Sequence, residues 1–397
     1  MSRPERLTGP PVLVIGGDAA ALSIARSLWA RGVQVRALAA PDSALRWSRC
    51  VELIPIAGPD FFERVEEFLL GPESEPYHGS VLFTVNDSGL SLMIEQREAL
   101  AKRFLLDRSN LDAQRCMLDK IASYEAAREC GVPTPRYWLA GEDLTPIKDQ
   151  LVFPLIVKPR HAHEASEMLN RKKYVRAENF EEAASAVKWM SDAGVDSFLV
   201  ELIPGPDTTL SSYYTYLDEH GETHFDFTKR IVRRFPKNRG LATLHMSDHV
   251  DGLKELSLAL WRHVGIQGLA NAEYKLDVRD GKYKLIESNC RFTGGTPSAA
   301  ACDRDLADLV YRQVVGLPPA HYEDFPDHVY FWKPRRDFSA FRELRALGEI
   351  TLWGWLRSVM NRNQLPLWSW SDPMPSLVNS ALFWRGVFGR ALTRITR

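Results

Sequence analysis

Three side chains with oxygen ligands, Glu273, Glu287 and Asn289, lie in or beside two stretches of alternating apolar residues, 270–278 and 282–288. The turn sequence Arg-Asp-Gly separates the two stretches, which predicts a β-hairpin. Because alternate side chains of a strand share a face, the two carboxylates and the amide can converge across this hairpin. Hard divalent cations such as Mg²⁺ bind one or two carboxylates together with substrate phosphates. The hairpin is therefore a candidate metal site, although a solvated polar face explains these residues alone equally well.

Two further features follow the hairpin. Arg291 shares the predicted face of Glu287 and Asn289 and is suited to pairing with a phosphate or a carboxylate, but the sequence leaves open which acid it faces. The stretch Thr-Gly-Gly-Thr-Pro-Ser at 293–298 precedes a predicted helix. It either binds an anionic substrate at the helix N-terminus or only caps the helix.

The composition is that of a globular protein. Of 397 residues, 45% are hydrophobic and 25% are charged, so disorder is not expected and the length allows two or three domains. The net charge of -1 gives no basic excess over the whole chain. Nucleic acid is therefore not expected as a partner.

The cysteines and the termini indicate a compartment. The five cysteines are scattered and never form a Cys-x-x-Cys pair, which argues against a disulfide framework and against a zinc site. The N-terminal residues lack the apolar core of a signal peptide, and no run of 18 apolar residues occurs. We expect a cytoplasmic protein that does not span a membrane.

The first hundred residues read as an α/β unit. A strand at 12–15, the pair Gly16-Gly17, a helix at about 19–31 and a strand at 33–39 form a βαβ opening. The later glycines of a dinucleotide fingerprint are missing, so a structural doubly wound (Rossmann-like) domain is favoured over nicotinamide or flavin binding. A further strand at 81–85 ends before Asp87, which either caps the next helix or contacts a substrate at the strand end.

The next segment changes in character. Residues 107–135 read as helical with Lys120 inside, where a lysine is ordinarily just solvated. The buried strand Phe-Pro-Leu-Ile-Val-Lys-Pro ends at Lys158, and after a polar loop come a helix at 180–193 and a strand at 197–202. These elements predict a separate α+β unit that closes on Ile-Pro-Gly.

The order of these motifs resembles the ATP-grasp superfamily over about residues 10–320. A helix lysine, a strand lysine followed by proline, a Val-Glu-x-x-Pro-Gly hinge, a basic strand and Glu…Glu-x-Asn-x-Arg follow one another as in that family. The resemblance implies a Rossmann-like domain at 1–106 and an ATP-grasp domain at 107–330, with a small subdomain at 135–203 and a large one at 204–330. A basic, Trp-rich helical extension at 331–397 would follow.

The resemblance also implies residue roles. Lys120 and Lys158 would reach the α- and β-phosphates of ATP, the backbone of Glu201, Leu202 and Ile203 would bind the adenine edge, and Asp207 would hold the ribose. Mg²⁺ or Mn²⁺ would sit on Glu273, Glu287 and Asn289, with Arg291 offsetting charge. The strand at 225–235 carries basic residues on both faces; alternation does not decide between them, and Lys229 and Arg233 are preferred as catalytic residues over Arg230.

One departure from the family concerns the loop after the strand lysine. This loop is often glycine-rich in the family, but here it contains no glycine between Arg160 and Lys173. Side chains of His161, His163, Lys172 or Lys173 could cover the phosphates instead. For the two histidines, exposed loop positions are the favoured interpretation.

The reaction implied by the resemblance joins a small-molecule carboxylate to an amine through an acyl phosphate, at the expense of ATP. It requires no nucleophilic side chain, and none is indicated by the sequence. Two alternatives stay open: a catalytically silent ATP-binding scaffold, and a ligase with a non-amine acceptor. A dehydrogenase, suggested only by the βαβ opening, is the least favoured function.

The C-terminal residues differ from the rest of the chain. Residues 332–397 hold six of the eleven tryptophans, and from 333 onward there are eleven Lys or Arg against four Asp or Glu. Apolar residues from Leu377 to Ile395 recur at helical spacing, which predicts a basic amphipathic helix. Residues 372–397 would bind an anionic membrane surface or, alternatively, pack on the protein or on a second subunit of a homodimer.

Overall fold

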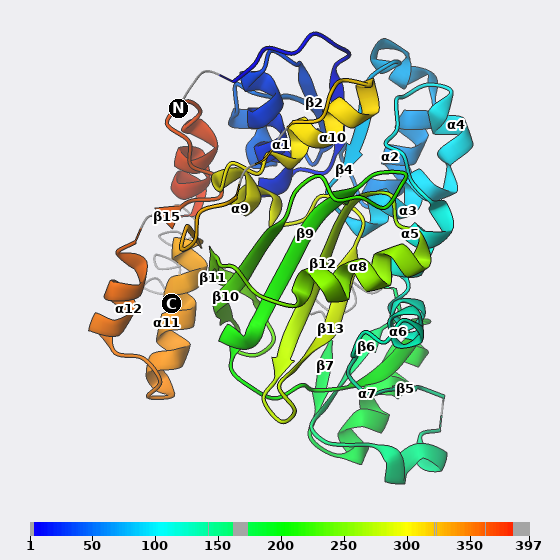
Figure 1. The fold of residues 1–397 in the computed structure, drawn as a ribbon, viewed down its shortest axis with the longest axis vertical. Coiled ribbons are helices and arrows are strands. Elements are labelled where there is room, and N and C mark those ends of the chain that lie inside the picture. The colour runs from blue at the N-terminus through cyan, green and yellow to red at the C-terminus, as the bar shows by residue number, and fades with distance from the viewer. Residues whose placement is uncertain are drawn as a thin grey trace, which may run out of the picture.

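The computed structural model describes residues 4–141, 143–161, 174–320, 322, 324–361 and 363–383. Within these residues, three β-sheets organise the chain (Figure 1). The N-terminal sheet lies at the top of the view, the central sheet in the middle and the small sheet at the lower right. The mixture of parallel and antiparallel sheets confirms the predicted α/β and α+β class.

The N-terminal sheet is parallel, with the strand order β3-β2-β1-β4. Its strands are β1 Val12–Ile15, β2 Val35–Ala39, β3 Glu52–Pro55 and β4 Val81–Thr84. All residues of β1 and β4 are buried, as expected for strands of a parallel sheet that is covered on both faces. Because β1 lies between β2 and β4, the carboxyl ends of β1 and β4 form the kind of switch point at which α/β folds bind ligands.

Helices and short 3₁₀ turns surround the N-terminal sheet. They are α1 Ala19–Ala30, η1 Ala44–Trp47, α2 Phe61–Leu70, η2 Pro72–Tyr77, α3 Asp87–Glu95 and α4 Arg97–Ala101. Asp18 caps α1, because its Oδ1 accepts hydrogen bonds from the backbone of Ala20 at 2.8 Å and Ala21 at 3.1 Å. Asn86 caps α3, so the prediction that Asp87 is the cap is wrong by one residue. Asp87 is the first helical residue, and its carboxylate is available for another role.

The predicted helical region at 107–135 is divided into two helices, α5 Leu111–Leu118 and α6 Lys120–Glu129. Asp119 separates them, since its carboxylate accepts from the first backbone N–H groups of α6. Lys120 is therefore the first residue of a helix and not an interior one. A cation there adds to the positive end of the helix dipole, which favours an anionic ligand.

The small sheet has the order β5-β8-β6-β7. Its strands are β5 Tyr137–Leu139, β6 Leu155–Pro159, β7 Val175–Ala177 and β8 Ser197–Glu201. The same segment contains the 3₁₀ turn η3 Thr145–Gln150 and the helix α7 Phe180–Asp192. Buried residues of α7 pack with Leu155, Val157 and Leu199 on one face of the sheet. The loop residues His163, Lys172 and Lys173, proposed from the sequence as a lid, lie outside the described residues.

The central sheet has the order β13-β12-β9-β10-β11-β14-β15. Its strands are β9 Leu210–Leu217, β10 Phe227–Phe235, β11 Leu241–Ser247, β12 Gly268–Asp277, β13 Lys282–Asn289, β14 Tyr330–Trp332 and β15 Asn363–Gln364, preceded by η4 Asp207–Thr209. Helix α8, Leu253–Val264, covers one face: buried Trp261 stacks on Tyr213 and donates to Ser288 Oγ at 2.9 Å. Ala270, Ala272 and Tyr274 of β12 are buried in this core. The alternate residues of β12 consequently project from the opposite face.

Helices α9 Thr296–Ala301 and α10 Leu306–Val315 connect the central sheet to the N-terminal unit. Residues of α9 and α10 share a hydrophobic core with α1. Tyr311 of α10 also donates a hydrogen bond to the backbone oxygen of Pro10 at 2.8 Å. The switch point of the N-terminal sheet is thereby held against the central sheet.

The C-terminal segment is partly built into the central sheet. Strand β14 pairs with β11 and is followed by α11 Pro334–Ala346, α12 Leu352–Val359 and β15. Asp372 is buried, and its carboxylate accepts from Arg26 at 3.0 Å and from Ser48 at 2.7 Å. The first part of the predicted extension is therefore packed on the protein. The predicted amphipathic helix is described only as far as Phe383, and residues 384–397 lie outside the described residues.

None of the helices in the described ranges is long and apolar enough to cross a membrane.

Candidate active site

A row of polar side chains crosses the face of the central sheet that lies opposite α8. Glu287 of β13 pairs with Glu273 of β12, Glu273 pairs with Ser212 of β9, and Ser212 pairs with Lys229 of β10. Directly opposed residues in an antiparallel sheet lie on the same face, with Cβ atoms about 5 Å apart. The predicted convergence of the two glutamates is therefore confirmed, and Lys229 lies two strands away on the same face.

Asn289 and Arg291 extend this site towards the N-terminal sheet. Asn289 lies opposite Asn271 in the hairpin, and its Oδ1 accepts from Arg291 Nη2 at 3.0 Å. Arg291 Nε donates to Asp87 Oδ1 at 2.6 Å, which identifies the acid that the sequence left open. Burial lowers the pKa of Arg291, but Asp87, together with Glu287 and Asp18, more than offsets this effect and the pKa is raised. The ion pair joins the end of the hairpin to the switch point at the carboxyl end of β4.

The oxygen ligands of the hairpin suit a magnesium ion. The described part of the chain contains no group of three or more His, Cys, Asp or Glu residues that could enclose a metal. Glu273, Glu287 and Asn289 supply two carboxylates and one amide oxygen, and Mg²⁺ is ordinarily bound by one or two carboxylates plus substrate phosphates. The donor set thus fits a cation that is shared with a nucleotide.

Two lysines reach the same region from outside the central sheet. Lys120 Nζ, at the start of α6, lies 3.9 Å from Glu287 Oε1. Lys158 on β6 is buried; its Nζ donates to Tyr124 Oη at 3.1 Å and lies 5.1 Å from the centre of that ring. Tyr124 in turn donates to the backbone oxygen of Ile286 at 3.0 Å. Both lysines are therefore brought next to β13 from elements far away in the sequence.

A cavity of about 370 Å³ lies where the small sheet meets the central sheet. Lys275, on the same face of β12 as Glu273, donates to the backbone oxygen of Ile203 at 2.8 Å. The predicted hinge therefore lines a pocket on the glutamate side of the sheet. The lining residues are Val152, Phe153, Pro154, Arg176, Glu201, Leu202, Ile203, Pro204, Gly205, Asn238, Lys275 and Arg279.

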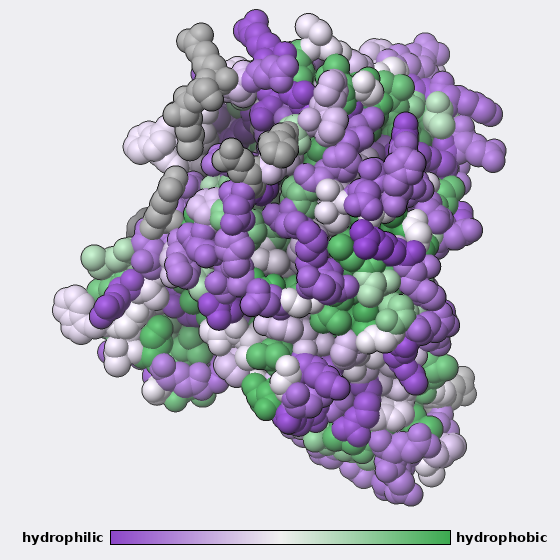
Figure 2. Space-filling view, in the orientation of Figure 1, coloured by the Kyte–Doolittle hydropathy of each residue, from purple (hydrophilic) through white to green (hydrophobic). Residues whose placement is uncertain are grey.

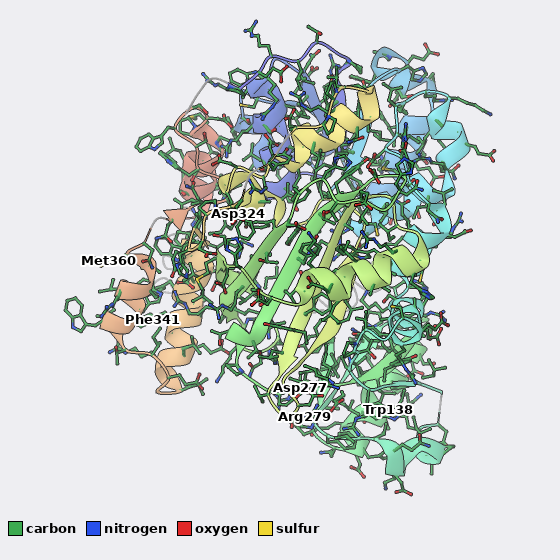
Figure 3. All side chains as sticks on the ribbon, viewed as in Figure 1. Trp138, Asp277, Arg279, Asp324, Phe341 and Met360 are labelled. Atoms are coloured by element: carbon green, nitrogen blue, oxygen red, sulfur yellow. The ribbon has the colours of Figure 1, made fainter. Side chains whose placement is uncertain are left out.

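The side chain of Glu201 has a structural role at this pocket. Its carboxylate accepts from Arg136 at 3.1 Å and pairs with Arg279 at 2.7 Å. Burial alone would raise the pKa of Glu201, but the two guanidinium groups hold it below its usual value. Figure 3 shows Arg279 beside Asp277 at the end of the hairpin, next to the small sheet. Glu201 thus joins the hairpin to the small sheet, and its backbone N–H donates to the backbone oxygen of Arg136 at 2.8 Å.

Comparison with known proteins finds similar ligases. No protein-family profile matches the chain. Over 296 residues the chain is 24% identical to the D-aspartate ligase of Enterococcus faecium (strain Aus0004), with 70% of each protein covered. Over 194 residues it is 25% identical to the D-alanine–D-alanine ligase of Alcanivorax borkumensis, with 46% of this chain and 57% of that protein covered.

Solved structures share the arrangement of the sheets. The L-amino acid ligase from Bacillus licheniformis superposes with a TM-score of 0.58 at 18% identity, covering 79% of this chain and 76% of that one. The N5-carboxyaminoimidazole synthetase from Staphylococcus aureus, complexed with ADP, gives 0.62 at 15% identity, with 82% of each chain covered. The chain has the ATP-grasp fold. The resemblance inferred from motif order is confirmed.

Within the ATP-grasp fold, Asp207 is engaged by protein groups. Arg234 donates two hydrogen bonds to Asp207 Oδ1, at 2.8 and 2.6 Å, and Asn238 N donates to Oδ2 at 3.2 Å. The role of Asp207 at the ribose stays a prediction. The sequence placed Arg234 on the face opposite Lys229. In the structure it lies near Lys275. Burial lowers the pKa of Lys275, and the charge of Arg234 lowers it further.

Arg233 is not brought to the glutamate row. The pairing of β10 with β11 shifts between Ile231 and Arg234, so the alternation that predicted a shared face for Lys229 and Arg233 is interrupted. Arg233 instead forms two hydrogen bonds of 2.9 Å with Asp337 of α11, and both side chains are almost fully buried. The expectation that Arg233 lies beside Lys229 in the cleft is wrong, because a long-range ion pair holds it.

Three residues near the site were missed by sequence reasoning. Asp18 follows β1, and burial raises the pKa of its carboxyl despite the hydrogen bonds to α1 and the charges of Arg291 and Lys333. His245 lies on β11 and Lys333 follows β14. The glycine pair before Asp18, at a strand end, was the available signal for Asp18. Neither His245 nor Lys333 belongs to a motif that could have revealed it.

Proposed function

We propose that the chain is an ATP-dependent ligase that activates a carboxylate as an acyl phosphate and joins it to an amine. One observation carries this proposal: the glutamate pair, Lys120 and Lys158 converge beside a hinge cavity large enough for a nucleotide base. The relatives named as ligases support it. So do ATP-grasp structures with bound ADP and with MgADP.

The nucleotide end of the cleft is served by residues on three elements. Glu273, Glu287 and Asn289 would hold Mg²⁺ or Mn²⁺, which when bound neutralises phosphate oxygens. Lys120 and Lys158 bind further phosphate oxygens as point charges. The hinge backbone from Glu201 to Ile203 binds the adenine edge.

At the reacting end, an oxygen of the substrate carboxylate attacks the γ-phosphorus of ATP. The bond from that phosphorus to its bridging oxygen breaks, and ADP leaves. An amine nitrogen then attacks the acyl carbon, the carbon–oxygen bond to the phosphate breaks, and the nitrogen loses a proton. Lys229 and Arg291 orient the anionic groups and offset their charge, so the protein contributes positioning and electrostatics.

The test is a measurement of ADP formation with paired carboxylate and amine substrates, beginning with D-aspartate and D-alanine as acids. Formation should depend on both substrates. Glu287→Gln should lower the rate at least about a hundredfold, because a group that binds the metal contributes several kcal/mol to the transition state. Glu222→Gln, at an exposed position, is the matched control and should leave the rate unchanged. ADP formation without any acceptor, or an active Glu287→Gln variant, would contradict the proposal.

The location of the acceptor is a finer proposal. We infer that the enzyme works at the inner membrane surface, on an acceptor carried there such as a cell-envelope precursor. Trp353 and Met360 are each 79% exposed and Trp370 is 88% exposed, within a segment rich in Lys and Arg. Apolar side chains show on the surface where α11 and α12 lie (Figure 2), and Met360 projects outward in Figure 3. Exposed aromatic and apolar groups among basic ones favour an anionic lipid surface.

Co-sedimentation with vesicles tests this location. Vesicles containing phosphatidylglycerol should bind the full chain, vesicles of phosphatidylcholine alone should not, and added salt should weaken binding. Replacing Trp353, Met360 and Trp370 by Ser should reduce binding. The truncated chain should end at Phe383, so that it keeps Asp372, which binds Arg26 and Ser48 of the N-terminal unit. Full binding by both the triple variant and the truncated chain would contradict the proposal.

A further inference from the structure

A second group of basic residues lies beyond Lys229, on the side of the sheet away from the glutamates. Lys229 pairs with Ser247 of β11, and His245 precedes Ser247 by two residues in that strand, so Lys229 and His245 share one face of the sheet. His245 also pairs with Phe331 of β14. Lys333 comes directly after β14, and its N–H donates to the backbone oxygen of Thr243 at 2.8 Å.

His245 presents an unsatisfied nitrogen in this group. The residue is 2% exposed, its ring stacks on Phe331, and Nε2 is 2.6 Å from Ser298 Oγ. Within the described part of the chain, its Nδ1 is buried and has no hydrogen-bond partner. Burial, together with Lys229 and Lys333, holds the pKa of His245 well below its usual value. A buried, neutral imidazole with an open nitrogen is costly unless a ligand completes it.

The two lysines of the group repel one another. Burial, then the charges of Lys229 and Arg336, lower the pKa of Lys333 to about 8, and only Asp18 acts in the opposite direction. Asp18 is occupied in capping α1. The charge of Lys229 is maintained against burial by Tyr214 and Glu273. An anion placed between the lysines would relieve the repulsion and the cost of burial together.

We propose that Lys229, His245 and Lys333 bind a second carboxylate of the substrate, so that the acid activated by this enzyme is a dicarboxylate such as an acidic amino acid. This inference rests on the proposed ligase function. Glu273 and His245 are on strands three positions apart in the sheet, which corresponds to about 14 Å. That span accommodates a phosphoryl group at the glutamates, a reacting carboxylate next to it, and a second carboxylate at His245 and Lys333.

The test uses isothermal titration calorimetry on the full chain with ADP and Mg²⁺ present, so that no turnover occurs. The probes are D-aspartate, L-aspartate and succinate, compared with D-alanine, L-alanine and butyrate as monoacids of similar size. The wild-type protein should bind at least one diacid about tenfold or more tightly than its matched monoacid. Equal binding of every diacid and its monoacid by the wild-type protein would overturn the inference.

Variants assign the effect to the proposed residues. Lys333→Gln should abolish the preference for a diacid, whereas Lys333→Arg should retain most of it and Arg342→Gln, at an exposed position of the same segment, should retain all of it. His245→Gln keeps a polar atom for Ser298 but lacks Nδ1, and should weaken diacid binding several-fold. ADP affinity and the melting temperature should change little in each case. A Lys333→Gln variant that folds and keeps the full preference would overturn the inference.

The assay separates this inference from the proposed function. Diacid binding is measured without turnover, so it can fail while ADP formation still depends on a carboxylate and an amine. Conversely, a protein that binds diacids through Lys333 but forms no ADP would contradict the ligase proposal alone.

Discussion

The ion pair between Arg233 of β10 and Asp337 of α11 gives the sharpest test of how the C-terminal segment is joined to the central sheet. Asp337 is 0% exposed, and besides Arg233 it accepts hydrogen bonds from Thr243 at 2.7 Å, Trp332 at 3.1 Å and Trp355 at 2.9 Å. The change Asp337→Asn keeps one acceptor oxygen, which suffices for the two indole N–H groups that share Oδ2, but it leaves Arg233 buried without a counter-charge. Loss of one partner of a buried pair costs about 3–5 kcal/mol of unfolding free energy.

The double variant Arg233→Met with Asp337→Asn removes both charges and should recover at least about half of that loss. Urea unfolding followed by tryptophan fluorescence measures the difference for each variant. The pH dependence supplies a second check. Burial raises the pKa of Asp337, but Arg233 and the other donors hold it below its usual value, so the pair's contribution is complete above the unfolded pKa of about 3.9. It is lost as the pH falls through the folded pKa, and the double variant should lack this acid-dependent loss.

A structural role for Arg233 requires that the double variant, once stable, still forms ADP. The reasoning is refuted if Asp337→Asn leaves the unfolding free energy unchanged. It is equally refuted if Arg233→Met abolishes ADP formation without affecting stability, because Arg233 would then act in catalysis as its sequence context suggested.

Three further outcomes are expected. Asp372→Ala should lower the unfolding free energy by about 3 kcal/mol through loss of a buried anchor, whereas Asp192→Ala, at an exposed pair, should stay within about 0.5 kcal/mol; equal effects in urea unfolding would contradict this. Gly295→Ala places a Cβ 2.0 Å from Tyr214 Oη and 3.0 Å from Lys229 Nζ, so displacement of Lys229 should raise the KM for the carboxylate while the KM for ATP changes little in the ADP assay; an unchanged carboxylate KM would argue against Lys229 as a carboxylate contact. Because the pKa of Lys333 is about 8, its charge is lost as the pH rises, and calorimetric D-aspartate affinity should fall about tenfold between pH 7 and pH 9; a flat profile would exclude Lys333 as the partner.

Local patterns predicted the hairpin and the pairing of its two glutamates well. The alternation in 270–278 and 282–288 and the turn between them specify a hairpin, and they place Glu273 opposite Glu287 without reference to the rest of the chain. The prediction succeeded because strand alternation and turn chemistry act between residues that are close in sequence.

The strand that connects this hairpin to Lys229 was not predicted. The sequence of β9, Leu-Ser-Ser-Tyr-Tyr-Thr-Tyr-Leu, shows no apolar alternation, because the strand is central in the sheet and buried along its whole length. Without β9, the sequence could not place Lys229 relative to Glu273. For the same reason it could not separate Lys229 from Arg233, whose strand is interrupted by register shifts.

By itself, the sequence determined most of the elements, their order and the residue types suited to phosphate and metal, because these depend on residue type and on spacing within a few residues. Only the tertiary structure decided which groups meet. Arg291 reaches Asp87 across 204 positions, Arg233 is held by Asp337 across 104, and His245 is joined with Lys333 through the pairing of β11 with β14. Such contacts form because both faces of a sheet are buried against distant helices. The periodicity of the sequence does not indicate which distant elements will pack together.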